Sequence, residues 1–304
     1  MARSVGILVN PDAGGGRARR AAPRLFDALV RRGFAASTIT ATDPAGALTM
    51  ARRAVADDID CLVAAGGDGT LSIALQAVAG TSTALGVAAL GTANDSARGL
   101  GLPIKDPEAA ARVIGEWAPR AVDAGLATTA DGTQRWFLGV LSSGFDAMVN
   151  ERSTRIAWPR GQARYLVALA AELRSFKPTR FDIDIDGTSL SGDTMFTAIG
   201  NGSRYGGGMR VCEGARLDDG MLTMTWVHRT GTREFIAAFP SVYRGTHLHR
   251  RSVTQHLGER FRVTAAGQVA YADGERIGPL PVDVEVRPGA VRMLLPEGCD
   301  TGSG

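Results

Sequence analysis

Cysteine is scarce in this sequence, and its scarcity excludes a fold built on disulfides. The 304 residues include only three cysteines, Cys61, Cys212 and Cys299, and no two of them form a Cys-x-x-Cys pair. An odd number without paired spacing argues against a disulfide framework. A reducing cytosol is therefore the simplest compartment for this chain.

Long apolar runs are missing as well. No stretch approaches the ~20 apolar residues that a membrane-spanning helix needs. The first apolar run, residues 5–9, ends at Asn10-Pro11 and is too short for the core of a signal peptide. We therefore expect a cytoplasmic protein, with any membrane contact peripheral at the inner membrane surface.

The sequence also lacks a charge excess and the two commonest nucleotide-binding fingerprints. Lys and Arg number 34 against 31 Asp and Glu, a formal net charge of +3 that gives no indication of a nucleic-acid partner. No GxxxxGK[ST] motif is present, and no GxGxxG follows the first apolar run. These absences exclude a P-loop protein and a standard dinucleotide-binding fold.

What is present in residues 1–122 is an alternation of short apolar runs with helical spacing. Strands are expected at 5–9, 35–40, 60–64 and 84–90, with helices that end near residues 32, 56 and 80. This alternation predicts an α/β domain with a parallel, doubly wound sheet. Ligands bind such sheets at the carboxyl ends of the strands.

The pattern changes at Asp123, after which period-two segments dominate. We expect strands at 135–141, 180–185, 193–200, 221–227, 261–265 and 282–286, and helices at 163–176 and 232–244. Asp131-Gly132 and Asp186-Gly187 are placed as hairpin turns. The sequence thus predicts a β-rich, sandwich-like second domain over residues 123–290, with a cleft between the domains. The last apolar run, near 290–296, could add a strand to either domain.

Gly66 to Thr70 forms the turn from a predicted buried strand into a helix. Its glycines allow backbone amides to approach phosphate oxygens, and the helix N-terminus favours negative charge. Asp68 would repel a phosphate directly but fits beside a Mg²⁺ ion that bridges it to the phosphates. The alternative is an ordinary turn in which Asp68 caps the helix.

Further segments follow in an order that resembles the diacylglycerol kinase catalytic family, which includes bacterial lipid kinases and sphingosine and ceramide kinases. The resemblance covers nearly the whole chain and rests on Gly66–Thr70 together with LGTANDSARGLG (90–101), GFDA (144–147), NGSRYGGGM (201–209), DDGML (218–222) and DGE (273–275). It implies an ATP- and Mg²⁺-dependent kinase that phosphorylates a lipid alcohol.

The resemblance also implies roles for individual residues. Nucleotide contacts would come from Gly66, Gly67, Asp68, Gly69, Thr70, Gly91, Thr92, Asn94 and Asp95, together with Thr42 or its neighbour Thr40. Asn10, which follows the first predicted strand, could contact a nucleotide or cap the turn. Asp68, Asp95 and Asp123 would hold the catalytic Mg²⁺, and a second, structural Mg²⁺ would bind Asp219 and the carbonyls of Met221 and Arg216. Glu275 matches the general base, with Asp273 beside it.

Several alternatives remain open on the sequence alone. Diacylglycerol is the first candidate acceptor, but ceramide and sphingosine are not distinguished from it. An NAD kinase shares the Gly66–Thr70 motif, and a catalytically silent lipid-binding protein could share the fold. The basic residues between Arg152 and Arg180 could contact anionic lipid headgroups or form a solvated face. The oligomeric state, a homodimer included, is undetermined, as is which of Asp273 and Glu275 is the base.

Overall fold

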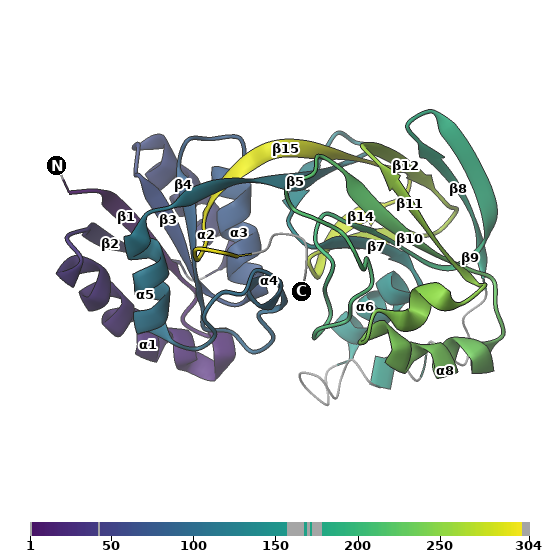
Figure 1. Cartoon of the computed structure of the whole chain (residues 1–304), viewed down its shortest axis with the longest axis horizontal. Coiled ribbons are helices and arrows are strands. Elements are labelled where there is room, and N and C mark those ends of the chain that lie inside the picture. The colour runs from purple at the N-terminus through teal and green to yellow at the C-terminus, as the bar shows by residue number, and fades with distance from the viewer. Residues whose placement is uncertain (1, 42, 157–166, 169–170, 172–177, 300–304) are drawn as a thin grey trace.

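Two lobes joined by long strands make up the molecule (Figure 1). The computed structural model describes residues 2–41, 43–156, 167–168, 171 and 178–299. The predicted helix at 163–176 lies almost wholly outside the described residues.

The first lobe is an α/β layer structure. Its strands run in the order β4-β3-β1-β2 and are all parallel. One core cluster packs α1 and α5 against the sheet, and a second packs α2 and α3 against it. The doubly wound prediction is therefore confirmed. The elements are β1 (Ser4–Val9), α1 (Ala13–Arg31), β2 (Ala35–Thr40), α2 (Pro44–Ala56), β3 (Cys61–Gly66), α3 (Asp68–Val78), β4 (Ala84–Ala89), α4 (Asp95–Gly99) and α5 (Pro107–Glu116).

The strand order places a switch point at β1. Both β2 and β3 pair with β1, one on each side, so the chain reverses its direction across the sheet there. Loops that leave the carboxyl ends of strands on opposite sides of such a point diverge and leave a crevice. The loops after β1 and β3 are those with Gly14–Gly16 and Gly66–Thr70.

The second lobe is built mainly from antiparallel strands. The hairpin turns at Asp131-Gly132 and Asp186-Gly187 are confirmed, with β6 pairing β5 and β9 pairing β8. Its elements are β5 (Pro119–Thr129), β6 (Gln134–Phe137), β7 (Val140–Gly144), α6 (Phe145–Arg155), β8 (Thr179–Ile185), β9 (Thr188–Gly200), β10 (Leu222–His228), α8 (Thr232–Val242), the 3₁₀ turn η1 (Thr246–His249), β11 (Val253–Gly258), β12 (Arg260–Thr264), β13 (Val269–Ala272), β14 (Glu275–Pro279) and β15 (Val282–Leu294).

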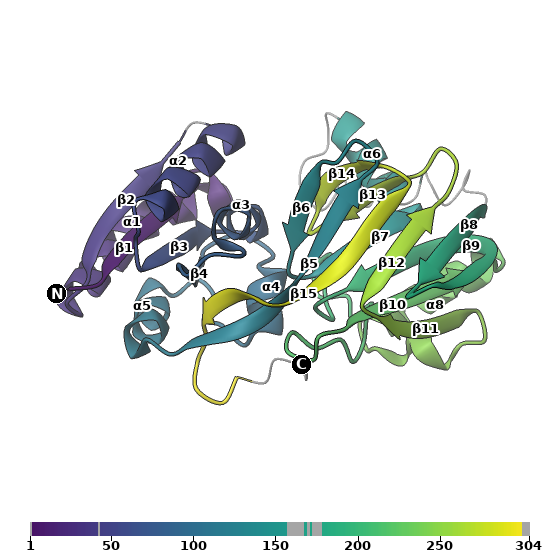
Figure 2. The same cartoon turned by 90° about the horizontal axis from the view of Figure 1, so that it is seen from above.

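Two strands run through both lobes. β5 and β15 pair in antiparallel fashion over nearly their whole lengths, and Arg292 and Met293 of β15 also pair in parallel with Ala84 and Leu85 of β4. Figure 2 shows these strands side by side across the junction. The boundary placed at residue 122 therefore falls inside β5, and one hydrogen-bonded sheet connects the lobes.

The predicted strand at 135–141 is interrupted. Residues 134–137 form β6 and residues 140–144 form β7. The amides of Leu138 and Gly139, between them, donate to the side chain of Asp273 instead of to a neighbouring strand. A long-range side-chain contact thus overrides the alternating pattern of the sequence.

Candidate active site

The Gly66–Thr70 turn has the predicted position between β3 and α3, but packing explains part of its glycine content. A Cβ atom on Gly66 would lie 2.1 Å from Thr70 Oγ1. A Cβ atom on Gly91 would lie 2.4 Å from the Cα atom of Gly67. The loops after β3 and β4 therefore touch backbone to backbone, which only glycine allows.

Asn94 shapes the loop in which it lies. It adopts a left-handed conformation (φ 55°) and is buried. Its Oδ1 accepts the amide of Gly91 at 3.0 Å, and its Nδ2 donates to the Gly91 carbonyl at 3.1 Å. The Asn94 side chain therefore uses its hydrogen bonds to close the turn between β4 and α4.

A large cleft of about 1010 Å³ lies at the carboxyl ends of β1 and β2. Asn10, Thr40 and Thr70 line it, whereas Thr42 lies outside the described residues. Asn10 Oδ1 accepts the amide of Asp12 at 3.1 Å, so this side chain caps the turn, one of the two roles expected of it. The cleft occupies the crevice that the switch point creates.

A second, smaller cavity of about 230 Å³, the acidic pocket, contains side chains from both lobes. Asp68 and Asp95 line it from the first lobe. The amide of Ser96 donates to Asp68 at 3.1 Å, and the amide of Gly207 donates to Asp95 at 2.5 Å. The second lobe therefore meets the first directly at the Asp95 carboxylate. The second lobe lines the pocket with Val140, Ser142, Arg204, Tyr205, Gly206, Tyr271, Asp273 and Gly274.

Burial raises the pKa of two carboxyl groups in the acidic pocket. At Asp95, loss of hydration is the largest cause, the negative charge of Asp68 adds to it, and the Gly207 amide opposes it. At Asp273, burial raises the pKa to about 6, although the amides of residues 138–140 favour the charged form. Raised values are expected where carboxylates gather out of water.

Asp273 and Gly274 form the turn of the β13–β14 hairpin, a position in which an Asp-Gly pair is common. The two oxygens of Asp273 accept three backbone amides of residues 138–140 at 2.9–3.1 Å. Glu275 is exposed, lies 3.9 Å from Arg135 Nη2 and is not among the residues that line the acidic pocket. Its Oε1 is close to Gly69, where a Cβ atom would be 3.8 Å away.

The predicted magnesium ligands do not form one cluster. No group of three or more His, Cys, Asp or Glu side chains suited to a metal occurs among the described residues. Asp123 accepts the amides of Gly220 and Gly289, each at 2.8 Å, and is not among the residues that line the acidic pocket with Asp68 and Asp95. Asp219 accepts the Met221 amide at 3.0 Å, and the Arg216 side chain pairs with Asp218.

Asp68 and Asp95 still fit a magnesium ion that also binds phosphate. Mg²⁺ is commonly held by one or two carboxylates, with water and substrate phosphates as its other ligands. Asp95 Oδ1 is buried without a hydrogen-bond partner among the described residues, which suits a cation ligand. The magnesium assignment itself remains a prediction.

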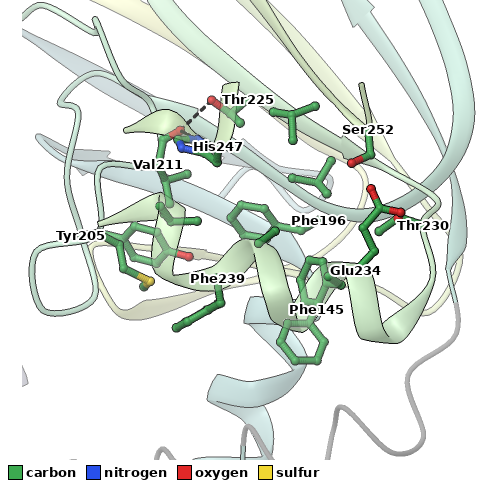
Figure 3. Close-up of a pocket in the computed structure, with 16 residues that line it drawn as sticks. Phe145, Phe196, Tyr205, Val211, Thr225, Thr230, Glu234, Phe239, His247 and Ser252 are labelled. Carbon is green, nitrogen blue, oxygen red and sulfur yellow. Dashed lines mark hydrogen bonds between the residues drawn. The ribbon is translucent and has the colours of Figure 1, made fainter. Parts of the chain in front are cut away.

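An apolar pocket lies beneath α8 (Figure 3). Phe145, Phe196 and Phe239 surround it, and Thr230, Glu234 and Ser252 lie at one end. Its volume in this structure is about 70 Å³. Tyr205 lines both this pocket and the acidic pocket, so the two cavities share a wall.

Four side chains at the junction had no role assigned from the sequence. Arg204 and Tyr205 belong to the 201–209 segment, whose glycine run was the available signal. Gln76 of α3 exchanges two hydrogen bonds with the backbone of Trp136 in β6, at 2.8 and 2.9 Å. Arg135 lies beside Glu275. Nothing in the local sequence distinguishes Gln76 or Arg135 from ordinary surface residues.

Comparison with known proteins agrees with this arrangement. Residues 4–127 match the diacylglycerol kinase catalytic domain, and residues 139–295 match the YegS C-terminal NAD kinase beta sandwich-like domain. A protein of Mycobacterium tuberculosis named diacylglycerol kinase is 36% identical over 293 residues, which cover 96% of this chain and 95% of that protein. The chain belongs to the diacylglycerol kinase catalytic family.

Another curated relative and two solved structures are also similar to this chain. A probable YegS-like lipid kinase of Stenotrophomonas maltophilia is 31% identical over 81% of this chain and 82% of its own length. A putative diacylglycerol kinase structure from Bacillus anthracis covers 97% of both chains with a TM-score of 0.77 at 21% identity, which shows the shared fold. An NAD kinase of Archaeoglobus fulgidus shares the fold more distantly, with a TM-score of 0.52 over 96% of this chain and 92% of its own.

One further observation concerns membrane-spanning helices. Among the described residues, no helix is both long and apolar enough to cross a bilayer. The basic region expected to contact anionic lipid lies largely in residues 157–166 and 172–177, outside the described residues. Peripheral binding through that region therefore stays a prediction.

Proposed function

We propose that this family member uses ATP and Mg²⁺ to phosphorylate the hydroxyl group of a lipid alcohol, with diacylglycerol as the first candidate and phosphatidic acid as the product. The observation that carries this proposal is the shared wall at Tyr205 between an acidic pocket and an apolar pocket. A kinase for lipids needs this pairing, because the reacting hydroxyl is polar and the rest of its substrate is not.

The nucleotide would occupy the large cleft, with its phosphates directed past the N-terminus of α3. Thr70 lines the large cleft and Asp68, two residues earlier, lines the acidic pocket. The first amides of α3 have no carbonyl partner within the helix and carry its positive dipole end. Phosphates placed there would lie between the two cavities.

In the reaction, the acceptor hydroxyl attacks the γ-phosphorus and loses its proton to a carboxylate. When bound, Mg²⁺ would neutralise phosphate charge between Asp68 and Asp95. Glu275 is the expected base because the oxygens of Asp273 are occupied by three amides. Both oxygens of Asp273 thus face the backbone of residues 138–140, even though burial raises its pKa, whereas the Glu275 carboxylate is exposed.

The apolar pocket would take the beginning of an acyl chain. Its volume of about 70 Å³ holds only part of such a chain, so α8 must move for full entry. This helix is suited to movement, since none of its residues is buried and Ile236 is 48% exposed. Weakly buried elements open at low free-energy cost.

The test is a thin-layer assay with γ-labelled ATP against diacylglycerol, ceramide, sphingosine, monoacylglycerol and NAD. We expect label in a phospholipid and in no nicotinamide product. Label in NADP, or in none of the lipids, would contradict the proposal.

A pair of variants on α8 tests the acyl site in the same assay. Phe239→Trp fills the apolar pocket and should raise the KM for the lipid by about 10-fold, with the KM for ATP unchanged. Ile236→Trp, on the exposed side of the same helix, is the matched control and should alter neither constant. Equal effects of the two variants would place the acyl chain elsewhere.

A further inference from the structure

The acidic pocket contains two charged groups of opposite sign that leave atoms without partners. Arg204 is the single cationic side chain among the described residues that line it, beside Asp68, Asp95 and Asp273. Arg204 Nε and Asp95 Oδ1 are both excluded from water, and neither has a hydrogen-bond partner in the described part of the chain. A guanidinium beside carboxylates ordinarily pairs with one of them.

No such pair forms here. Within the described residues, the ion pairs of this protein do not include Arg204. A guanidinium nitrogen and a carboxylate oxygen, both buried in one pocket without a partner among the described residues, indicate that a ligand contacts both groups when the site is filled. That ligand would have to satisfy a cationic donor on one side and a carboxylate, through a metal ion, on the other.

The backbone fixes Arg204 in this place. Tyr205 and Met209 exchange backbone hydrogen bonds at 3.1 and 3.0 Å, which closes the loop that follows Arg204. Gly206–Gly208 have φ angles of 62°, 86° and 97°, a conformation that favours glycine. The loop then donates the Gly207 amide to Asp95, so the first lobe anchors the loop that carries Arg204.

We propose that Arg204 is a catalytic residue that binds the phosphoryl group during its transfer. This inference rests on the proposed kinase function. A phosphoryl group carries negative charge that three nearby carboxylates would repel, and Mg²⁺ between Asp68 and Asp95 would offset that charge on one side only. Arg204 supplies the opposing cation from the second lobe, and its planar donors match phosphate oxygens.

The step leaves Arg204 chemically unchanged. The bond from the γ-phosphorus to the β–γ bridging oxygen breaks, and ADP departs with that electron pair. The acceptor oxygen forms the new bond to phosphorus, while its proton passes to the carboxylate base. Arg204 donates hydrogen bonds to the oxygens of the moving group, where charge must be stabilised in the transition state.

The kinetic test compares Arg204→Ala and Arg204→Lys with the wild type. We expect Arg204→Ala to lower kcat by about 10²–10³-fold, with the KM for ATP changed by less than about threefold. Arg204→Lys should restore part of the loss, since it keeps the charge without the planar donors. Added guanidinium at millimolar concentration should partly rescue Arg204→Ala, which a merely structural role would not allow.

Arg262→Ala is the matched control. Arg262 lies on β12, is exposed, pairs with Asp283 and is not among the residues that line the acidic pocket, so its loss should leave kcat unchanged. A kcat of Arg204→Ala within about threefold of the wild-type value would overturn the proposal. So would a large loss accompanied by a lowered melting temperature and no guanidinium rescue.

A binding measurement separates this proposal from the choice of acceptor. ADP with Mg²⁺ and aluminium fluoride mimics the transferring phosphoryl group and needs no lipid turnover. We expect Arg204→Ala to lose affinity for this mixture while it keeps its affinity for ADP alone. If the wild type phosphorylates none of the lipids but shows this Arg204-dependent binding, the acceptor assignment fails and the role of Arg204 stands. Equal binding by wild type and variant would overturn that role.

Discussion

Four aspartates lie at the junction of the lobes and form two pairs. The carboxylate oxygens of one pair make different contacts from those of the other. Asp123 and Asp273 each accept backbone amides with both carboxylate oxygens, two amides in one case and three in the other. Asp68 accepts the amide of Ser96, and Asp95 accepts that of Gly207 while its Oδ1 has no partner among the described residues. The first pair, which we term the clamp pair, holds segments of chain together, whereas the second pair leaves oxygen atoms for a ligand.

The largest effect is expected from the ligand pair. Asp68→Asn keeps an oxygen for the Ser96 amide but removes the charge that Mg²⁺ requires. It should lower kcat on the order of 10⁴-fold, because several kcal/mol of charge stabilisation are lost. The melting temperature should stay within about 2 °C of the wild-type value. Retained turnover with normal magnesium dependence would remove Asp68 from the ligand pair.

The next largest effect distinguishes Glu275 from Asp273. Glu275→Gln preserves shape and removes the proton acceptor, so kcat should fall by about 10²–10⁴-fold with little change in ATP affinity. Asp273→Asn should act chiefly on stability, since an amide group cannot accept all three of the hydrogen bonds that the carboxylate accepts. Steady-state kinetics and thermal melts of both variants provide the comparison.

Other outcomes would change the assignment. Near-normal kcat in Glu275→Gln together with its loss in a folded Asp273→Asn would reverse the two roles. Retained kcat in both would place the base elsewhere.

A third prediction concerns stability at Asp123. This side chain is 4% exposed, and Asp123→Ala removes the acceptor of the Gly220 and Gly289 amides. Each hydrogen bond lost from the charged carboxylate costs about 1.5–3 kcal/mol, so the melting temperature should fall by several degrees. Below that temperature kcat should change much less than in Asp68→Asn. A large loss of kcat at an unchanged melting temperature would instead support Asp123 as a ligand of the catalytic Mg²⁺.

The smallest expected effect is the pH dependence of stability at Asp273. Its pKa is raised to about 6 in the folded protein, above the usual value of about 3.9 in an unfolded chain. The stabilisation that protonation brings is complete at low pH and is lost as the pH rises through about 6. The melting temperature of the wild type relative to Asp273→Asn should therefore be higher at pH 4.5 than at pH 7. A difference that does not vary with pH would contradict this value.

The sequence predicts local features well and long-range partners poorly. Hairpins at Asp131-Gly132 and Asp186-Gly187 follow from turn chemistry within a few residues, and so does the strand–turn–helix at Gly66–Thr70. By contrast, Asp123 takes its amide partners from positions 97 and 166 residues away. Such partners depend on strand register across the assembled sheet.

The role of a functional residue depends on the same long-range packing. In the sequence, nothing distinguishes Arg204 from other basic residues. Its loop is anchored to Asp95 in the fold, and this places Arg204 in the same pocket as three carboxylates. Asn94 shows the converse, since its motif suggests a nucleotide ligand while its side chain closes its own turn. A sequence motif therefore indicates where the site lies, whereas the fold determines which contacts each residue of the motif makes.

The distinction between the two pairs can be measured directly through the effect of Mg²⁺ on ADP binding. The affinity for ADP would be determined by calorimetry with and without Mg²⁺ for the wild type, Asp68→Asn and Asp123→Asn, at a temperature where all three are folded. We expect Mg²⁺ to strengthen ADP binding in the wild type and in Asp123→Asn but not in Asp68→Asn. Loss of the magnesium effect in Asp123→Asn, with its retention in Asp68→Asn, would contradict the account.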